Sequence, residues 1–243
     1  MYYALFEPSG VIWVLVVSNI GLAEDFPTMK PAAFLNSSMK DFVLNLNIDY
    51  RYLKTAYYVS MHAEVLGNRV IPTTENIIDT SRTPLLLLKA SRAGIPTLPY
   101  LVTSSVKQIV TEYGFPVVVF AVNPFCHDGF KIAQNLSALY RAVKSLSMNY
   151  KFAVCIQPLR GEMRTVKSFF GKIETNGAAG KIAERVYEVF NLPICKLHIQ
   201  IVGNEAYLCG LQPLRTEDVA MADLKLISTE VSRILDKGEP LLG

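Results

Sequence analysis

The chain has 243 residues, of which 51% are hydrophobic and 19% charged, and its formal net charge is +3. This composition is typical of a globular protein with a substantial buried core, and it excludes a long disordered arm. Basic residues are scattered along the sequence rather than clustered, so we expect no nucleic-acid partner.

The first strong apolar run covers residues 11–17 and predicts a buried strand. It is far shorter than the roughly 20 residues that cross a bilayer, so we expect no membrane partner. Glu7 is the only charge ahead of the run, whereas a signal peptide would begin with basic residues. These features predict a cytoplasmic protein.

The spacing of the four cysteines matches neither a zinc site nor a redox motif. Each cysteine lies in or beside an apolar stretch, so we expect buried, inert thiols in a reducing compartment. A nucleophilic Cys–His pair is not expected at positions 126 and 127, because adjacent side chains rarely face each other. The cysteines are Cys126, Cys155, Cys195 and Cys209.

Strand and helix patterns alternate along the chain, which predicts an α/β protein. A helix is expected over residues 50–66, with Gly67 as its C-cap, followed by a short strand at 70–71. The next helix should follow Thr83 as N-cap and end before Gly94. The middle of the chain predicts strands at 97–102, 116–122 and 152–156 and helices at 104–113 and 136–146.

The last third of the sequence predicts a helix at 178–190, a strand pair and a closing helix. The strands at 194–202 and 206–211 are joined by the turn-forming dipeptide Gly203-Asn204. The closing helix is expected over 216–235, where its acidic first residues suit the positive end of the helix dipole.

Four sequence blocks occur in an order that a known family shares. They are residues 66–72 (LGNRVIP), residues 78–99 with AGIPTLP at their end, residues 114–119 (GFPVVV) and residues 155–164 (CIQPLRGEMR). Together they resemble the ATP-grasp superfamily, closest to its RimK-like carboxylate-amine ligases, which add glutamate to a ribosomal protein tail or to an aminoadipate carrier in lysine biosynthesis.

The resemblance implies an α/β, ATP-grasp-like fold with a small N-terminal α/β lobe and two α+β lobes that enclose a cleft. We expect the N-terminal lobe at residues 1–72, the central ATP-grasp lobe at 73–156 and the C-terminal ATP-grasp lobe at 157–243.

ATP-grasp ligases activate a carboxylate as an acyl phosphate, which an amine then attacks. Lysines and arginines hold the phosphates, and acidic residues with an Asn hold magnesium. The resemblance therefore implies ATP and Mg as cofactors if this chain is a ligase, and otherwise no cofactor.

The two phosphate-binding lysines of the family are replaced here. The first corresponds to Arg82, which keeps the charge; a role in local capping, or simple solvation, is an equal alternative. The second corresponds to Phe120, which can pack but cannot neutralise phosphate. Lys131 would reach into the cleft instead, or it is a solvated lysine at a strand edge.

The hinge that binds adenine in the family keeps Gln157, whereas Pro158 replaces the next Glu and removes a donor. The N–H of Leu159 would then help to bind adenine. Glu162 and Arg164 correspond to the acid and base of the family's "D-I-R" block, whose Arg steers the acyl phosphate. They point to one side of an alternating strand, so a structural salt bridge is an equally good interpretation.

The family's magnesium ligands are missing at the matching positions. Its Asp corresponds to His198, and its closing "E-V-N" corresponds to Gly210, Leu211 and Gln212. A lone His on an apolar strand is typical of a core residue, and magnesium prefers oxygen ligands. We therefore expect no metal site.

The leading hypothesis is a degenerate ATP-grasp protein that binds rather than catalyses. Its ligand would be a small molecule such as a nucleotide, or a protein partner such as a homologous ligase. Two alternatives stay open. One is an active ATP-dependent carboxylate-amine ligase with relocated residues, namely Arg82, Lys131, Glu162 and Arg164. The other is a structural subunit that forms homo-oligomers.

Overall fold

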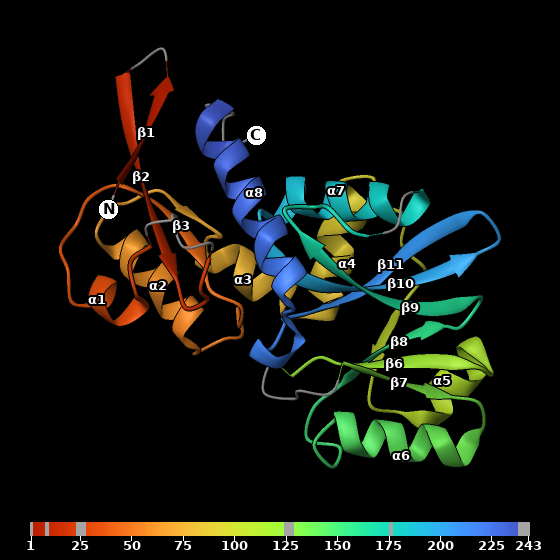
Figure 1. The fold of residues 1–243 in the computed structure, drawn as a ribbon. Helices are drawn as coiled ribbons and strands as arrows, with labels where there is room; N and C mark the ends of the chain where they lie inside the picture. The colour runs from red at the N-terminus through yellow and green to blue at the C-terminus, as the bar shows by residue number, and fades with distance from the viewer. Residues whose placement is uncertain (1, 8–9, 23–27, 124–128, 175–176, 238–243) are drawn as a thin grey trace.

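The computed structural model describes residues 2–7, 10–22, 28–123, 129–174 and 177–237, and it contains three β-sheets covered by helices (Figure 1). Among the described residues, no helix combines the length and the apolar character needed to cross a membrane.

The first sheet has the strand order β1-β2-β3-β4, with β1 antiparallel to β2 and the other neighbours parallel. Leu15, Val17 and Val43 point to one face, where they pack on α1 and α2. The elements of this part are β1 (Tyr2–Glu7), β2 (Gly10–Ser18), α1 (Pro31–Leu35), β3 (Phe42–Leu46), α2 (Thr55–Val65), β4 (Val70–Ile71) and α3 (Thr74–Thr80).

The second sheet is antiparallel, with the order β5-β8-β6-β7. Helices α5 and α6 cover one face, because Val117, Val119 and Ile156 pack there against apolar side chains of both helices. Its elements are β5 (Leu101–Thr103), α5 (Val106–Tyr113), β6 (Val117–Ala121), β7 (Phe130–Ala133), α6 (Leu136–Leu146) and β8 (Val154–Pro158).

The third sheet is antiparallel, with the order β11-β10-β9, and its core face packs against α4 and α7 through Leu197 and Ile199. Helix α8 lies between this sheet and the first one (Figure 1), and Ile227 and Val231 join the same core. The elements are α4 (Thr83–Arg92), β9 (Glu162–Phe169), α7 (Ala178–Phe190), β10 (Ile194–Val202), β11 (Glu205–Gln212) and α8 (Met221–Lys237).

Helices α6 and α7 and strand β10 cover the predicted residues, whereas several other boundaries were wrong. The helix predicted over 50–66 begins only at Thr55, because Leu53 has a left-handed φ of 61°. Arg82, rather than Thr83, is the N-cap of α4. Thr97 makes only an isolated bridge with Leu208, so strand β5 begins at Leu101 instead of 97.

Two later boundaries also differ from the prediction. The N–H of Phe152 bonds to the carbonyl of Ser147 over 3.0 Å, so strand β8 begins at Val154. The closing helix does not begin at 216: a 3₁₀ turn, Thr216–Asp218, comes first, and Asp223 then accepts a hydrogen bond of 2.8 Å from the N–H of Ala220 ahead of α8. Five elements were not predicted from the sequence: β1, β3, β7, α1 and α3.

Candidate functional site

The second and third sheets meet along a seam that is filled by apolar side chains. We call this group the inter-sheet cluster. One side of the cluster is the face of the second sheet that does not pack on α5 and α6. The other side is strand β11 and helix α4. The buried members of the cluster are at most 1% exposed. They are Leu87, Val118, Phe120, Cys155 and Cys209, with Tyr100, Val122, Phe130, Leu159 and Met163 packed around them.

The side chain of Phe120, on β6 of the second sheet, extends across the seam to the third sheet. Its centroid is 5.7 Å from that of Phe130 and 6.1 Å from that of His198. A Cβ added to Gly210 would lie 2.8 Å from Cε1 of Phe120, so the ring occupies the space that a side chain at position 210 would need. The position that resembles a phosphate-binding lysine is therefore an apolar contact across the seam.

His198 is a buried partner of this ring. Its Nδ1 lies 3.0 Å from Oγ1 of Thr165, and its ring meets that of Phe130 edge to face at 4.9 Å. Burial and the positive charge of Lys196 together lower the pKa of His198 to about 4, although a hydrogen bond with Gln212 acts in the opposite direction. The imidazole is therefore neutral at pH 7.

The described residues contain no group of three or more His, Cys, Asp and Glu side chains that could hold a metal ion. At the seam, the positions that correspond to the family's magnesium ligands are His198, Gly210 and Gln212. His198 is close to the other two. A Cβ added to Gly129 would lie 3.1 Å from Nε2 of His198 and 2.8 Å from Oε1 of Gln212. This donor set does not fit magnesium, because it contains no carboxylate.

Gln157 and Leu159 lie at the seam, but the N–H groups expected to bind adenine already donate hydrogen bonds to backbone carbonyls of the protein. Nε2 of the fully buried Gln157 donates to the carbonyl of Cys209 over 3.0 Å and so ties β8 to β11. Its Oε1 is buried and has no hydrogen-bond partner among the described residues. The N–H of Leu159, expected to serve adenine, donates to the carbonyl of Pro116 over 3.0 Å.

Neither Arg82 nor Lys131 is part of the inter-sheet cluster. Arg82 is exposed at the start of α4. Lys131 pairs with Val119, whose side chain packs toward α6, and its Nζ donates to Oγ of Ser145 on that helix over 2.6 Å. The structure therefore places Lys131 on the helix-covered face of the second sheet.

Glu162 and Arg164 form an ion pair of 2.7 Å, and each side chain is more than half exposed. They alternate along β9 with Met163, which packs on the inter-sheet cluster, and with Thr165, which contacts His198. Since neighbours on a strand point to opposite faces, Glu162 and Arg164 point away from the seam. The structure does not bring them together with Gln157 and Leu159.

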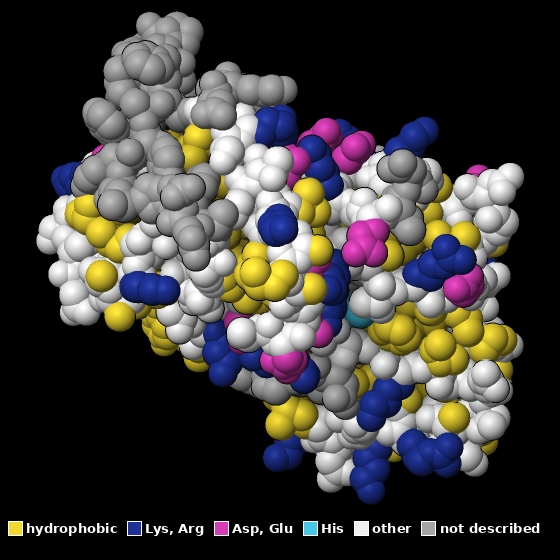
Figure 2. Space-filling model, viewed as in Figure 1, with side chains coloured by type: hydrophobic (Ala, Val, Ile, Leu, Met, Phe, Trp, Pro, Cys, Tyr) yellow, Lys and Arg dark blue, Asp and Glu magenta, His cyan; other side chains and the backbone are white. Residues whose placement is uncertain are grey.

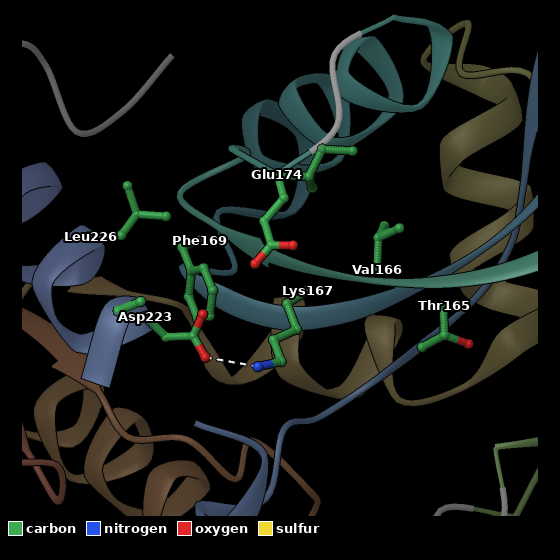
Figure 3. Close-up of a pocket in the computed structure, with 9 residues that line it drawn as sticks. Thr165, Val166, Lys167, Phe169, Glu174, Asp223 and Leu226 are labelled. Carbon is green, nitrogen blue, oxygen red and sulfur yellow. Dashed lines mark hydrogen bonds and ion pairs between the residues drawn. The ribbon is translucent and has the colours of Figure 1, made fainter. Parts of the chain in front are cut away.

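A pocket of about 470 Å³ lies between β9 and the start of α8 (Figure 3), and the sequence analysis did not predict it. Nζ of Lys167 is 2.8 Å from Oδ2 of Asp223, which also caps α8. The carboxylate of Glu174 points into the same space (Figure 3). The remaining lining residues are Thr165, Val166, Phe169, Ile173, Ala222 and Leu226. The sequence feature that could have indicated this pocket is Asp223, an acidic residue in the first turn of the last helix.

Cys155, Cys195 and Cys209 are free and buried, and burial raises the pKa of each thiol to about 12. The prediction of buried thiols is confirmed for these three. Cys126 and His127 lie outside the described residues.

Comparison with known proteins identifies the architecture. A model of the RimK-like ATPgrasp N-terminal domain matches residues 32–230. The chain belongs to this family. Among curated proteins, none matches the sequence.

Solved ATP-grasp structures share the fold at low sequence identity. A RimK-domain ATP-grasp protein from Sphaerobacter thermophilus is 14% identical with a TM-score of 0.59, covering 88% of this chain and 98% of its own. The D-alanine–D-alanine ligase from Bacillus anthracis is 13% identical with a TM-score of 0.60, covering 92% and 98%. The ligase PsnB in complex with a minimal precursor is 12% identical with a TM-score of 0.56, covering 90% and 98%.

These findings confirm the predicted α/β, ATP-grasp-like fold and the RimK-like resemblance. The expected division at residues 72 and 156 stays a prediction. Within this fold, residues 120, 198, 210 and 212, which the resemblance predicts to be replaced family positions, are neighbours in space.

Proposed function

We propose that this protein is a non-catalytic ATP-grasp protein that acts by binding. The observation that carries the proposal is the contact of Phe120 with His198 and with the space above Gly210. At this position the family resemblance implies a lysine that holds phosphate. A buried phenyl ring at this position cannot neutralise the charge of a triphosphate between the sheets.

The electrostatic cost supports this proposal. Phosphoryl transfer depends on cations that neutralise the charge on the phosphate oxygens, and unpaired charge in a dry interior costs many kcal/mol. The described part of the seam offers a neutral imidazole, thiols held in their neutral form and apolar side chains. Binding of Mg·ATP in that place would require the two sheets to separate, and the described residues contain no group of three or more His, Cys, Asp and Glu side chains that could hold the magnesium.

We place a small ligand in the pocket between β9 and α8. Its walls are mainly apolar, its Lys167–Asp223 pair is internally neutral, and Glu174 adds a single negative charge. This chemistry suits a molecule with an apolar body and an amino group. In a thermal-shift screen of amines and amino acids, Leu226→Trp, which fills the pocket, should abolish any stabilisation that the wild type shows.

A homologous RimK-like ligase is the protein partner that we favour, because the chain itself belongs to a RimK-like family. The three described free thiols suit a cytoplasmic location for such a pair. The alternative of an active ligase depends on Arg82, Lys131, Glu162 and Arg164. Glu162 and Arg164 pair with each other on β9, whereas Lys131 lies on the helix-covered face of the second sheet. A homo-oligomer would be identified by sedimentation at micromolar concentration.

The decisive assay measures ADP release from Mg·ATP in the presence of mixed amino acids and carboxylate acceptors. A D-alanine–D-alanine ligase with its substrate serves as the positive control. We expect release at the rate of the protein-free blank. Release that needs both a carboxylate and an amine, and that is lost in Arg164→Ala, would establish the ligase alternative instead.

A further inference from the structure

A 33-residue part of the chain, residues 129–161, carries five basic side chains and no acidic one. The other 210 residues carry 19 basic and 21 acidic side chains, so the positive charge of the protein is concentrated in this part. Basic residues are scattered along the sequence, but in residues 129–161 no acidic side chain balances them. In Figure 2, Lys and Arg side chains but no Asp or Glu lie over the lobe at the bottom of the view, where Figure 1 places α6.

The same region exposes large apolar side chains. Leu136, Tyr140 and Lys144 follow one another at helical spacing along the outer side of α6, while Leu139 and Val143 are buried against the sheet. We define the α6 surface by its exposed residues. They are Leu136, Tyr140, Arg141, Lys144, Met148, Tyr150, Lys151 and Phe152, of which the apolar ones are 43–50% exposed.

The loop after α6 holds its side chains outward in an unusual backbone conformation. Met148, Asn149 and Tyr150 are three consecutive non-glycine residues with φ of 50°, 59° and 65°. This region costs roughly 1–2 kcal/mol for an ordinary L-residue, and glycine would adopt it without strain. Met148 and Tyr150 nevertheless keep large, exposed side chains. Strain retained at exposed residues is typical of a functional surface.

Hydrogen bonds fix this loop to the end of the helix. The N–H of Asn149 bonds to the carbonyl of Lys144 over 2.8 Å, and the N–H of Tyr150 bonds to Oγ of Ser147 over 2.7 Å. The α6 surface is therefore preformed, so a partner would not have to order it on binding.

We infer that the α6 surface docks a protein partner whose own surface is acidic and carries apolar side chains. This inference rests on the proposed function, in which the chain binds a protein. Tyr, Phe, Met and Arg are enriched in protein interfaces, and a surface with cations and no carboxylate selects an acidic partner.

The surface is less suited to two other polyanions. Nucleic-acid binding depends on many phosphate contacts, whereas this surface has three cations and the chain a net charge of only +3. A helix that lies on a membrane inserts its apolar face, but the apolar face of α6 packs on the second sheet, with Leu139 and Val143 buried.

The test measures fluorescence anisotropy of a labelled peptide that alternates glutamate pairs with single leucines. Lys144→Glu should weaken its binding about tenfold, because a charge on the docking surface is reversed. Lys181→Glu changes another exposed lysine, on α7; it is the matched control and should bind as the wild type does. Tyr140→Ser should weaken binding at high salt as well, where charge attraction is screened.

Three results would overturn the inference. These are no peptide binding by the wild type, equal weakening by Lys181→Glu and Lys144→Glu, and tight binding of oligo-dT or phosphatidylserine vesicles in place of the peptide. Unchanged melting temperatures of the variants exclude misfolding as a cause. ADP release is measured separately and bears only on the proposed function, so the two failures are distinguishable.

Discussion

Replacing Gly210 by alanine tests whether Phe120 closes the seam between the second and third sheets. The new Cβ would lie 2.8 Å from Cε1 and 3.1 Å from Cδ1 of Phe120, and 3.5 Å from Cδ2 of His198. Carbon atoms normally approach to about 3.5–4.0 Å, so the ring has to move. Phe120 is 1% exposed and packed on all sides, and such overpacking costs about 1–3 kcal/mol.

Denaturant and thermal unfolding measure this cost. For a chain of this size, 1 kcal/mol shifts the melting temperature by roughly 2–4 °C, so Gly210→Ala should lower it by about 2–12 °C. Gly21→Ala is the matched control, because no heavy atom lies within 4 Å of its Cβ and its φ is not left-handed. It should change the free energy of unfolding by no more than about 0.5 kcal/mol.

A double variant separates contact from general disruption. Phe120→Leu removes part of the ring that the new methyl group meets, so Phe120→Leu/Gly210→Ala should be more stable than the sum of the single effects predicts. Additive effects, or a Gly210→Ala protein as stable as the wild type, would mean that the ring does not contact position 210 and that the seam is open.

Three further predictions follow from titratable groups. His198 has a pKa of about 4 in the folded chain against 6.5 ordinarily, so the unfolded chain binds the proton first as the pH falls. The free energy of unfolding should therefore fall by up to about 3 kcal/mol from pH 6.5 to pH 4. Urea titrations of His198→Gln should show no such pH dependence of the free energy of unfolding. Burial opposes the charged form of Glu230, but Lys172 and Arg233 hold its pKa below 4.5. The charged carboxylate therefore stabilises the fold above that pH, and this contribution disappears as the carboxylate protonates. Glu230→Gln should be less stable than the wild type at pH 7 and less sensitive to acid in denaturant unfolding, and equal stability at pH 7 would contradict this. In a Cys126→Ser variant, the three remaining thiols should resist an aromatic disulfide reagent at pH 8 until denaturant is added, and rapid labelling of the native protein would disprove their burial.

Elements with a strong sequence period were predictable, and short elements were not. Helices α6 and α7 follow the predicted bounds because their apolar residues recur at helical spacing and their buried faces coincide with that pattern. Strand β7 was missed because Phe130–Ala133 is too short to establish an alternation, and it is defined by pairing with β6. Strand β3 is buried on both faces and shows no alternation at all.

The sequence predicted individual residues of the candidate site but not the contacts between them. The family resemblance predicts, for Phe120, His198 and Gly210 separately, that each replaces a charged position. It does not reveal that the ring of Phe120 fills the space left by Gly210 and meets His198, because these contacts join strands about 80 to 90 residues apart. The pocket between β9 and α8 depends in the same way on Lys167 meeting Asp223 across two elements.

Calorimetric titration with ATP and with ADP, each with and without magnesium, tests the central claim most directly. A D-alanine–D-alanine ligase titrated under the same conditions gives the heat expected of an open ATP-grasp cleft. We expect no heat and no thermal stabilisation for this protein, because Phe120 closes the seam and no carboxylate of the described residues accompanies His198 there. Binding that strengthens with magnesium would contradict it, since it would require phosphate and metal ligands between the two sheets.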